Sequence, residues 1–151
     1  MAYMDQERKQ KLAPQIKRVL KKYGMKGTIA TQHHSALVVN IKSGPLDIIG
    51  NMIEMDEKNH SYWKDREIPT NIQVNEHWIE RNYSGEVLNF LTEIKEAMDG
   101  CPEFQNHNRS DMMTDYHDVG WYTYINVGRW DKPYILVEKT SKMLSLLYNR
   151  R

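Results

Sequence analysis

Residues 121–137 read WYTYINVGRWDKPYILV, and this stretch carries the clearest structural signal in the sequence. Trp, Tyr, Thr, Ile and Val fit the pleated, half-buried surface of a sheet, so residues 121–127 and 134–137 predict two strands. Between them, Gly128 can adopt a positive φ angle and Pro133 suits a turn or a sheet edge. The stretch therefore predicts a β-hairpin near the C-terminal end of the sequence.

Side chains alternate along a strand, so the first predicted strand has two different faces. One face is mostly apolar and is expected to meet the core: Trp121, Thr123, Ile125 and Val127. The other face carries Tyr122, Tyr124 and Asn126, and tyrosine suits a boundary because it has both a ring and a hydroxyl. Residues 116–134 hold six of the fifteen aromatic residues. Such density is typical of a packed sheet and also of a recognition surface.

The rest of the chain predicts further helices and strands. Apolar residues at helical spacing predict helices over 5–23, from Pro45 to about Asp56 and over 84–99, with short helices after Asn75 and over 139–149. β-Favouring residues predict strands over 27–32, 35–41 and 72–74. Pro14 lies inside the first predicted helix, which therefore either kinks or begins there.

Two polar segments complete this pattern, since residues 56–70 and 101–118 predict loops. The order of elements predicts one α+β domain over residues 1–151, with 139–151 as a terminal helix or tail. We expect an antiparallel sheet of four to five strands, with helices packed on one face and a C-terminal β-hairpin.

Composition limits the class of protein. The chain has 151 residues, of which 40% are hydrophobic and 27% charged, as is typical of a globular protein with a real core. No apolar run reaches the roughly 20 residues that span a bilayer, and the N-terminal residues have no apolar signal segment. A lone cysteine, Cys101, cannot form an internal disulfide, which favours a reducing compartment. We expect a cytoplasmic protein that does not bind a membrane.

Charge is spread unevenly, although the net charge is +1. Residues 1–26 carry eight Lys or Arg against two Asp or Glu, whereas residues 45–118 carry six against sixteen. Either these segments form a dipolar surface for a charged partner, or folding interleaves them. The same choice applies to the first helix, whose basic residues either contact phosphates or form a solvated face.

No catalytic or cofactor motif is present in the sequence, because it lacks a P-loop, a Rossmann glycine pattern, a G-x-S-x-G and an HExxH. The chain is therefore expected to be non-enzymatic and to need no cofactor. The third hypothesis for function is an enzyme with a site around Asp115, His117 and Asp118. These residues are the strongest candidate for a metal site, since carboxylate and imidazole suit zinc. That group has no second set of residues at ligand spacing, so polar loop side chains are the alternative.

Two surfaces are candidates for binding. Exposed aromatic residues favour a protein interface, and the candidate residues are Tyr122, Tyr124, Arg129, Trp130 and Lys132. The alternative is nucleic-acid binding through the tyrosines and a set of basic residues on the first helix, namely Lys17, Arg18, Lys21 and Lys22. A pI of about 7.8 lies below that of a typical nucleic-acid binder. A homodimer through an edge strand or the terminal helix stays open.

Several segments together resemble a known kind of protein. They are KKYG at 21–24, ALVVNIKSGP at 36–45 with the helix after it, and DVGWYTYINVGRWDKPY at 118–134. These segments resemble small uncharacterised proteins of bacteriophages and conjugative elements and, more distantly, a domain associated with large polyvalent proteins. Residues 56–70 and the C-terminal tail depart from that pattern.

The resemblance implies an accessory function of a mobile element in the cytoplasm of a bacterial host. Such a function is take-over of host processes or protection of incoming DNA from host defences. It supplies no catalytic residue. We therefore expect a protein that binds a host macromolecule, with a host protein as the leading expectation and nucleic acid as the alternative.

Overall fold

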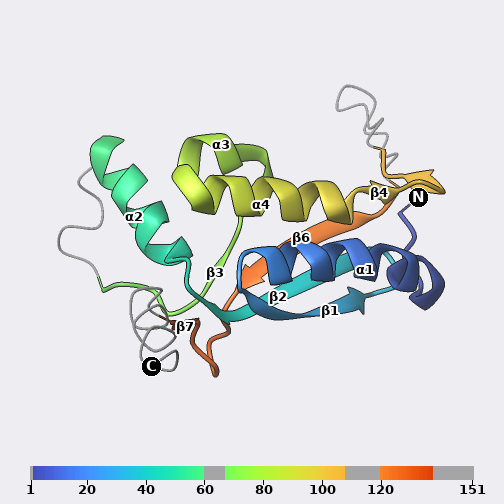
Figure 1. Ribbon diagram of the computed structural model, residues 1–151, viewed down its shortest axis with the longest axis horizontal. Helices are drawn as coiled ribbons and strands as arrows, with labels where there is room; N and C mark the ends of the chain where they lie inside the picture. Colours follow the sequence, from blue (N-terminus) through green and yellow to red (C-terminus); the bar gives the residue numbers. More distant parts are fainter. Residues whose placement is uncertain (1, 60–66, 108–119, 138–151) are drawn as a thin grey trace, which may run out of the picture.

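The computed structural model describes residues 2–59, 67–107 and 120–137, and the elements below belong to these ranges (Figure 1). The α-helices are α1 (Gln6–Lys22), α2 (Ile48–Asn59), α3 (Ile79–Asn82) and α4 (Gly85–Met98). One five-stranded sheet contains β1 (Lys26–Gln32), β2 (Ala36–Gly44), β3 (Ile72–Gln73), β6 (Tyr122–Val127) and β7 (Ile135–Leu136). A smaller sheet pairs β4 (Gly100–Cys101) with β5 (Phe104–Gln105), and η1 (Glu76–Trp78) is a 3-10 helix. The predicted α+β class is confirmed.

The main sheet is mixed, so the prediction of an antiparallel sheet is wrong. Its strand order is β1-β2-β6-β3, with β7 also paired to β2. β1 is antiparallel to β2 and β3 is antiparallel to β6, whereas both β6 and β7 run parallel to β2. A parallel neighbour requires a long crossover, and the chain between β2 and β6 provides one that includes α2 and α4.

The predicted C-terminal hairpin is not confirmed. β6 lies beside residues 36–41 of β2, and β7 lies beside residues 43–44 of the same strand in the same direction. The intervening loop does form a tight turn, because the backbone N–H of Arg129 donates to the Lys132 carbonyl at 2.8 Å and the reverse bond is 3.2 Å. Gly128 enters it with a φ of +74°, and a Cβ there would lie 2.6 Å from the Tyr134 nitrogen. The chain must reverse again before β7.

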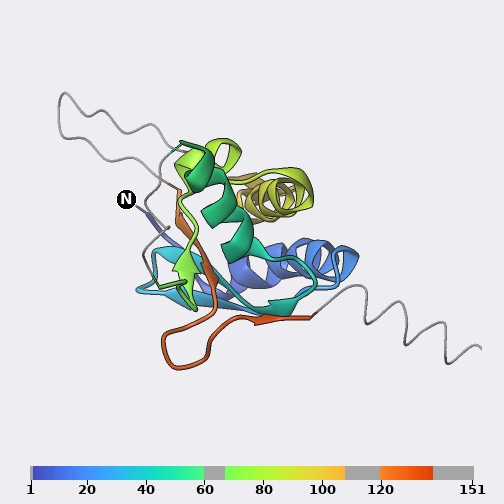
Figure 2. The same ribbon diagram turned by 90° about the vertical axis from the view of Figure 1, so that its left-hand side faces the viewer.

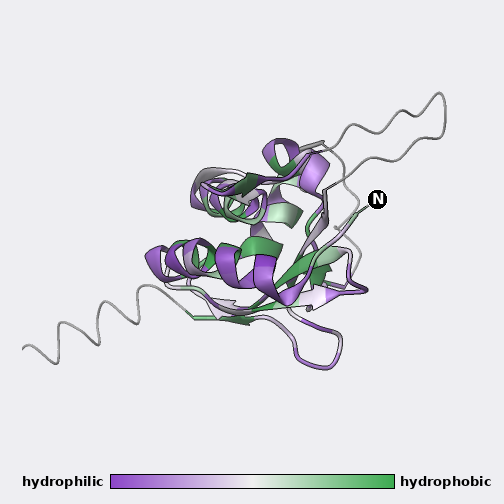
Figure 3. Cartoon of the chain, turned by 90° about the vertical axis from the view of Figure 1, so that its right-hand side faces the viewer, coloured by the Kyte–Doolittle hydropathy of each residue, from purple (hydrophilic) through white to green (hydrophobic). Residues whose placement is uncertain are grey.

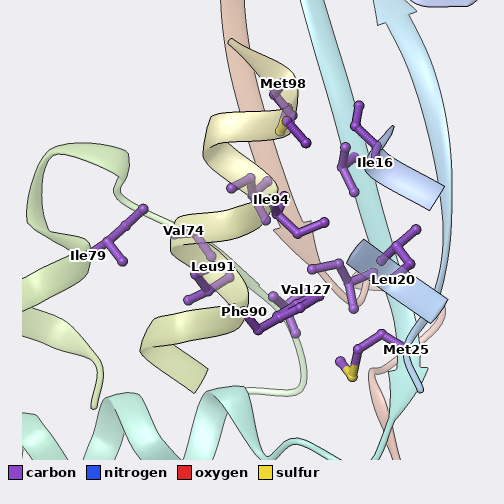
Figure 4. Close-up of a cluster of buried hydrophobic side chains, with 14 of the residues drawn as sticks. Ile16, Leu20, Met25, Val74, Ile79, Phe90, Leu91, Ile94, Met98 and Val127 are labelled. Atoms are coloured by element: carbon purple, nitrogen blue, oxygen red, sulfur yellow. The ribbon is translucent and has the colours of Figure 1, made fainter. Parts of the chain in front are cut away.

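Helices α1 and α4 cover one face of the sheet (Figure 2). The helix α1 buries Leu12, Ile16 and Leu20, which recur every fourth residue, and α4 buries Phe90 among others. Figure 4 shows side chains of both helices meeting Val127 of β6. The helix α1 continues through Pro14, which lies on its exposed side. The helix does not begin at Pro14, because Asp5 caps it by accepting from the Arg8 N–H at 2.8 Å.

Several boundaries differ from those expected. β2 continues through Gly44, because Ser43 and Gly44 pair with β7, and α2 consequently starts at Ile48 and extends to Asn59. The predicted short strand at Ile72 and the cap at Asn75 are confirmed. The small β4–β5 sheet lies in a segment expected to be a loop. The predicted terminal helix over 139–149 lies outside the described residues.

Candidate functional site

The second face of the sheet is not covered by any of the described helices (Figure 2). On β6 this face presents Tyr122, which is 41% exposed, and the half-buried Tyr124 and Asn126. The register places Val38 beside Tyr124 and Asn40 beside Asn126, whose side-chain amide donates to the Asn40 oxygen at 3.1 Å. The face therefore combines aromatic rings with amides and small side chains.

The turn after β6 extends this face. In Figure 2 the turn projects on the side of the sheet opposite to α1 and α4. Trp130 at its tip is 84% exposed. Trp130 lines a hollow of about 350 Å³ together with Asn40, Gln73 and Asn126 of the sheet. We call Tyr122, Tyr124, Arg129, Trp130 and Lys132 the aromatic face, since these predicted residues follow one another along β6 and its turn.

The helix α1, which carries the predicted basic residues, lies on the opposite side of the sheet from the turn after β6 (Figure 3). Lys17, Arg18, Lys21 and Lys22 are all exposed. Lys22 forms an ion pair with Glu93 of α4 at 2.7 Å, which lowers the pKa of the Glu93 carboxyl through a hydrogen bond. The structure thus separates the two groups of residues that the nucleic-acid interpretation combines.

A polar cluster at the free edge of β6 was not predicted from the sequence. Thr123 donates its hydroxyl proton to Glu76 at 2.6 Å and accepts from the Lys95 ammonium at 2.9 Å. The same ammonium lies 2.8 Å from Asp99 and 3.6 Å from the second Glu76 oxygen. Strand β3 ends before this point, so these side chains line a hollow of about 510 Å³ at the sheet edge.

Burial raises the pKa of the Glu76 carboxyl above its ordinary value, and the negative charge of Asp99 acts in the same direction. The Thr123 hydroxyl and the Lys95 ammonium oppose this rise. A carboxyl, a hydroxyl and an ammonium in contact are groups that proton-transfer chemistry uses. Here they satisfy one another, and Thr123 is only 6% exposed. The arrangement therefore stabilises the edge of the sheet and positions no free nucleophile.

Asn106 completes the same edge. Its side-chain oxygen accepts from the Trp121 backbone N–H at 3.0 Å, and its amide nitrogen donates to the Trp121 carbonyl at 3.0 Å. The side chain thereby makes the pair of bonds that a neighbouring strand would make. Trp121 is also fixed by its indole N–H, which donates to the Met98 carbonyl at 3.0 Å.

The metal hypothesis finds no new support. Asp115, His117 and Asp118 lie outside the described residues. Within ranges 2–59, 67–107 and 120–137, no group of three or more His, Cys, Asp or Glu side chains is placed to hold a metal ion. Cys101 is buried as a free thiol. No helix in the described part of the chain is long and apolar enough to cross a membrane.

Comparisons with family models, curated proteins and solved structures find no match to this chain. Function is therefore inferred from the chemistry of the surface. The aromatic residues could be found by strand alternation, whereas Glu76, Lys95 and Asn106 had no signal in the sequence. They come from different segments and meet only through the tertiary fold.

Proposed function

We propose that the protein acts without catalysis by binding a partner protein on its aromatic face. The observation that carries this proposal is the 84% exposure of Trp130 beside a sheet face that no described helix covers and that also presents Tyr122. Tryptophan and tyrosine contribute a large share of binding energy at protein interfaces, because they bury much area with few rotatable bonds. An exposed tryptophan at the tip of a turn is well placed to enter a pocket on a partner.

Two features favour a protein over a nucleic acid. The strands of this face contribute amide and small side chains around the tyrosines, and Arg129 lies 3.4 Å from Asp131, which offsets its charge. The basic side of α1 lies across the sheet, so one strand of nucleic acid could not contact both groups without bending around the molecule. Binding to phosphates relies on clustered cations, and this face offers few.

The dimensions of the face suit a compact epitope. From Tyr122 to Gly128 the strand advances about 20 Å at roughly 3.3 Å per residue, and the turn adds to this length. A standard protein interface buries about 800 Å² on each partner. The aromatic face with its amides would supply the centre of such an interface, with Trp130 and the hollow at one end. That the partner belongs to a bacterial host is the part of this proposal that follows from the sequence resemblance.

The experiment compares captured proteins for three forms of the tagged chain in host lysate, with and without nuclease, by mass spectrometry. The forms are the natural sequence, the double variant Tyr124→Ala with Trp130→Ala, and Trp78→Ala as a matched control. Trp78 on η1 is 50% exposed and is not one of the residues of the aromatic face. We expect one dominant protein that survives nuclease, is retained by Trp78→Ala and is lost by the double variant.

Full capture by a correctly folded double variant would remove the aromatic face as the interface. Capture of many different proteins that is lost after nuclease treatment would instead support nucleic-acid binding. In that case affinity must fall steeply with salt, because bound phosphates release counterions. Substitution of Lys17 and Lys21 would then weaken binding more than substitution of the tyrosines.

A further inference from the structure

We propose a second interaction surface, in which the outer edge of β1 binds an extended acidic segment of a partner protein as an added strand. This inference is independent of the aromatic face. β1 has seven residues and stands at one end of the strand order. All seven pair with β2 on one side, and no strand among the described residues pairs with the other side.

The backbone groups at this edge can be assigned from the hydrogen bonds of β2. The carbonyls of Ser35 and Ile41 accept from N–H groups of the segment containing β6, so the odd-numbered residues of β2 direct their polar groups toward β6. The even-numbered residues must then pair with β1, and the register places them opposite even-numbered residues of β1. The N–H and C=O groups of Gly27, Ile29 and Thr31 therefore point to the outer edge.

Apart from Lys26 at its start, this edge lacks the usual protection against pairing. Natural edge strands are commonly blocked by charged residues, by proline or by a very short length. Residues 27–32 read GTIATQ and contain neither a charge nor a proline. The only irregularity is a shift of register between Lys26 and Gly27, which leaves the rest of the strand regular. An extended segment can thus continue the sheet by bonding to three successive outward-facing residues.

The positive charges of α1 beside β1 indicate that the bound segment is acidic. Near the start of α1, the Gln6 side-chain amide donates to the Thr31 hydroxyl at 3.2 Å, so this side of the helix faces β1. Lys17 follows Gln6 by eleven residues, about three helical turns, and Lys21 follows one turn later. Both lysines therefore project on the β1 side of α1. They are exposed, and neither has an acidic partner among the described residues.

The lysines on the other side of the same helix are paired. Lys11 lies 2.6 Å from Glu103, and Lys22 lies 2.7 Å from Glu93. Lysines of α1 that face α4 and the β4–β5 turn are thus paired with carboxylates, whereas Lys17 and Lys21 on the β1 side are not. Carboxylates at alternate positions of an added strand would lie on the helix side of the sheet and face these cations.

A second copy of this chain is the other candidate occupant. An antiparallel β1–β1 pair has its two-fold axis perpendicular to the joined sheet, which places both α1 helices on the same face. Lys17 and Lys21 of the two copies then lie toward opposite ends of the pair, because each α1 begins beside Thr31 and ends beside the start of β1. Repulsion between these lysines therefore does not oppose self-pairing, and the measurement of self-association distinguishes the two occupants.

The test uses two labelled ten-residue peptides, alternating Val-Glu and alternating Val-Lys, and measures their affinity by fluorescence anisotropy. Amide hydrogen exchange on the complex then locates the bound strand. We expect the Val-Glu peptide to bind at least tenfold more tightly, with slower exchange at the outward N–H groups of Gly27, Ile29 and Thr31. Equal affinity for the two peptides, or protection confined to other residues, would overturn the proposal.

Two sets of variants separate charge from strand pairing. Lys17→Glu with Lys21→Glu should weaken Val-Glu binding about tenfold or more, whereas Lys11→Glu with Lys22→Glu makes the same change of net charge on the paired side and should alter it by less than threefold. Thr31→Pro removes one outward N–H and should abolish binding, while Thr31→Ala keeps that N–H and should retain it. If Thr31→Pro does not fold, the two lysine pairs still decide the question.

Self-association is measured on the free protein by analytical ultracentrifugation. We expect no dimer that depends on β1. A dimer that Thr31→Pro or a charge at Ile29 dissociates would identify a second copy as the occupant and overturn the acidic partner. The capture experiment on the aromatic face has separate variants, so either surface can fail without the other.

Discussion

Neighbouring residues of β6 lie on opposite faces of the sheet, and the described helices cover one of these faces but not the other. Trp121, Ile125 and Val127 are at most 2% exposed because α1 and α4 pack over them, whereas Tyr122 on the other face is 41% exposed. Both sets are strong strand formers, so β propensity does not distinguish them. The difference shows that α1 and α4 bury one face of β6 in the core, whereas no described helix covers the other.

The sharpest test of this contrast is a pair of truncations on the same strand. Ile125→Ala should lower the free energy of unfolding by about 2–5 kcal/mol, because it removes a side chain that is fully buried and leaves a cavity. Tyr122→Ala should lower it by less than about 1 kcal/mol, because that residue is exposed. Urea denaturation of both variants measures the difference, and equal losses would mean that the second face is covered in solution.

A smaller effect is expected at the edge of the strand. Asn106→Ala leaves the N–H and carbonyl of the buried Trp121 without the partners described above, and should cost about 1–3 kcal/mol. Gln105→Ala is the control, since its amide donates to the Cys101 carbonyl from an exposed position. Equilibrium unfolding should rank Asn106→Ala as clearly the more damaging. The reverse order would show that Asn106 does not act as a substitute strand.

The polar cluster predicts a dependence on pH. Because the pKa of Glu76 is raised in the folded protein, its protonation stabilises the fold below the ordinary glutamate range. That contribution is lost as pH rises through the raised value. Glutamine does not ionise, so Glu76→Gln does not lose stability in this way. The natural protein should therefore become less stable relative to the variant as pH increases from about 4 to about 8.

Unfolding curves across this pH range provide the measurement for Glu76→Gln. Glu80→Gln, which changes an exposed glutamate in α3, is the control for removal of one negative charge. A difference between the natural protein and Glu76→Gln that stays constant with pH would contradict the assigned shift.

The smallest effect on stability is expected at the turn. Trp130→Ala should change the free energy of unfolding by no more than about 0.5 kcal/mol, because its side chain makes few contacts in the fold. Thermal or chemical unfolding checks this, and the capture experiment supplies the second measurement. A large loss of stability would show that Trp130 packs within the molecule and is not a free anchor.

Local patterns predicted much of this molecule. Alternation along 121–127 correctly assigned the inner and outer side chains of β6. Helical spacing over 5–23 predicted the helix α1, in which Leu12, Ile16 and Leu20 are buried. These features depend on neighbours within one element, so the sequence contains the information. The aromatic residues of the candidate face follow from the same alternation.

Strand partners could not be predicted in this way. The segment 121–137 was expected to pair with itself, yet β6 and β7 both pair with β2, because the crossover through α2 and α4 brings them in parallel to it. Nothing in a strand's own sequence states the direction of its neighbour. The ion pair between Lys95 and Glu76 likewise joins α4 to η1 across the fold.

The α+β class and the two different faces of β6 could be predicted from the sequence, which also contains no recognisable catalytic motif. The tertiary structure was needed to show that the sheet is mixed and that α1 and the tyrosines lie on opposite sides of it. It was also needed to show that no described strand pairs with the outer edge of β1 near Lys17 and Lys21. The difference arises from how far apart in the sequence the contacting residues lie. Periodicity reports contacts a few residues apart, whereas edges, layers and charge separation arise from contacts between distant segments.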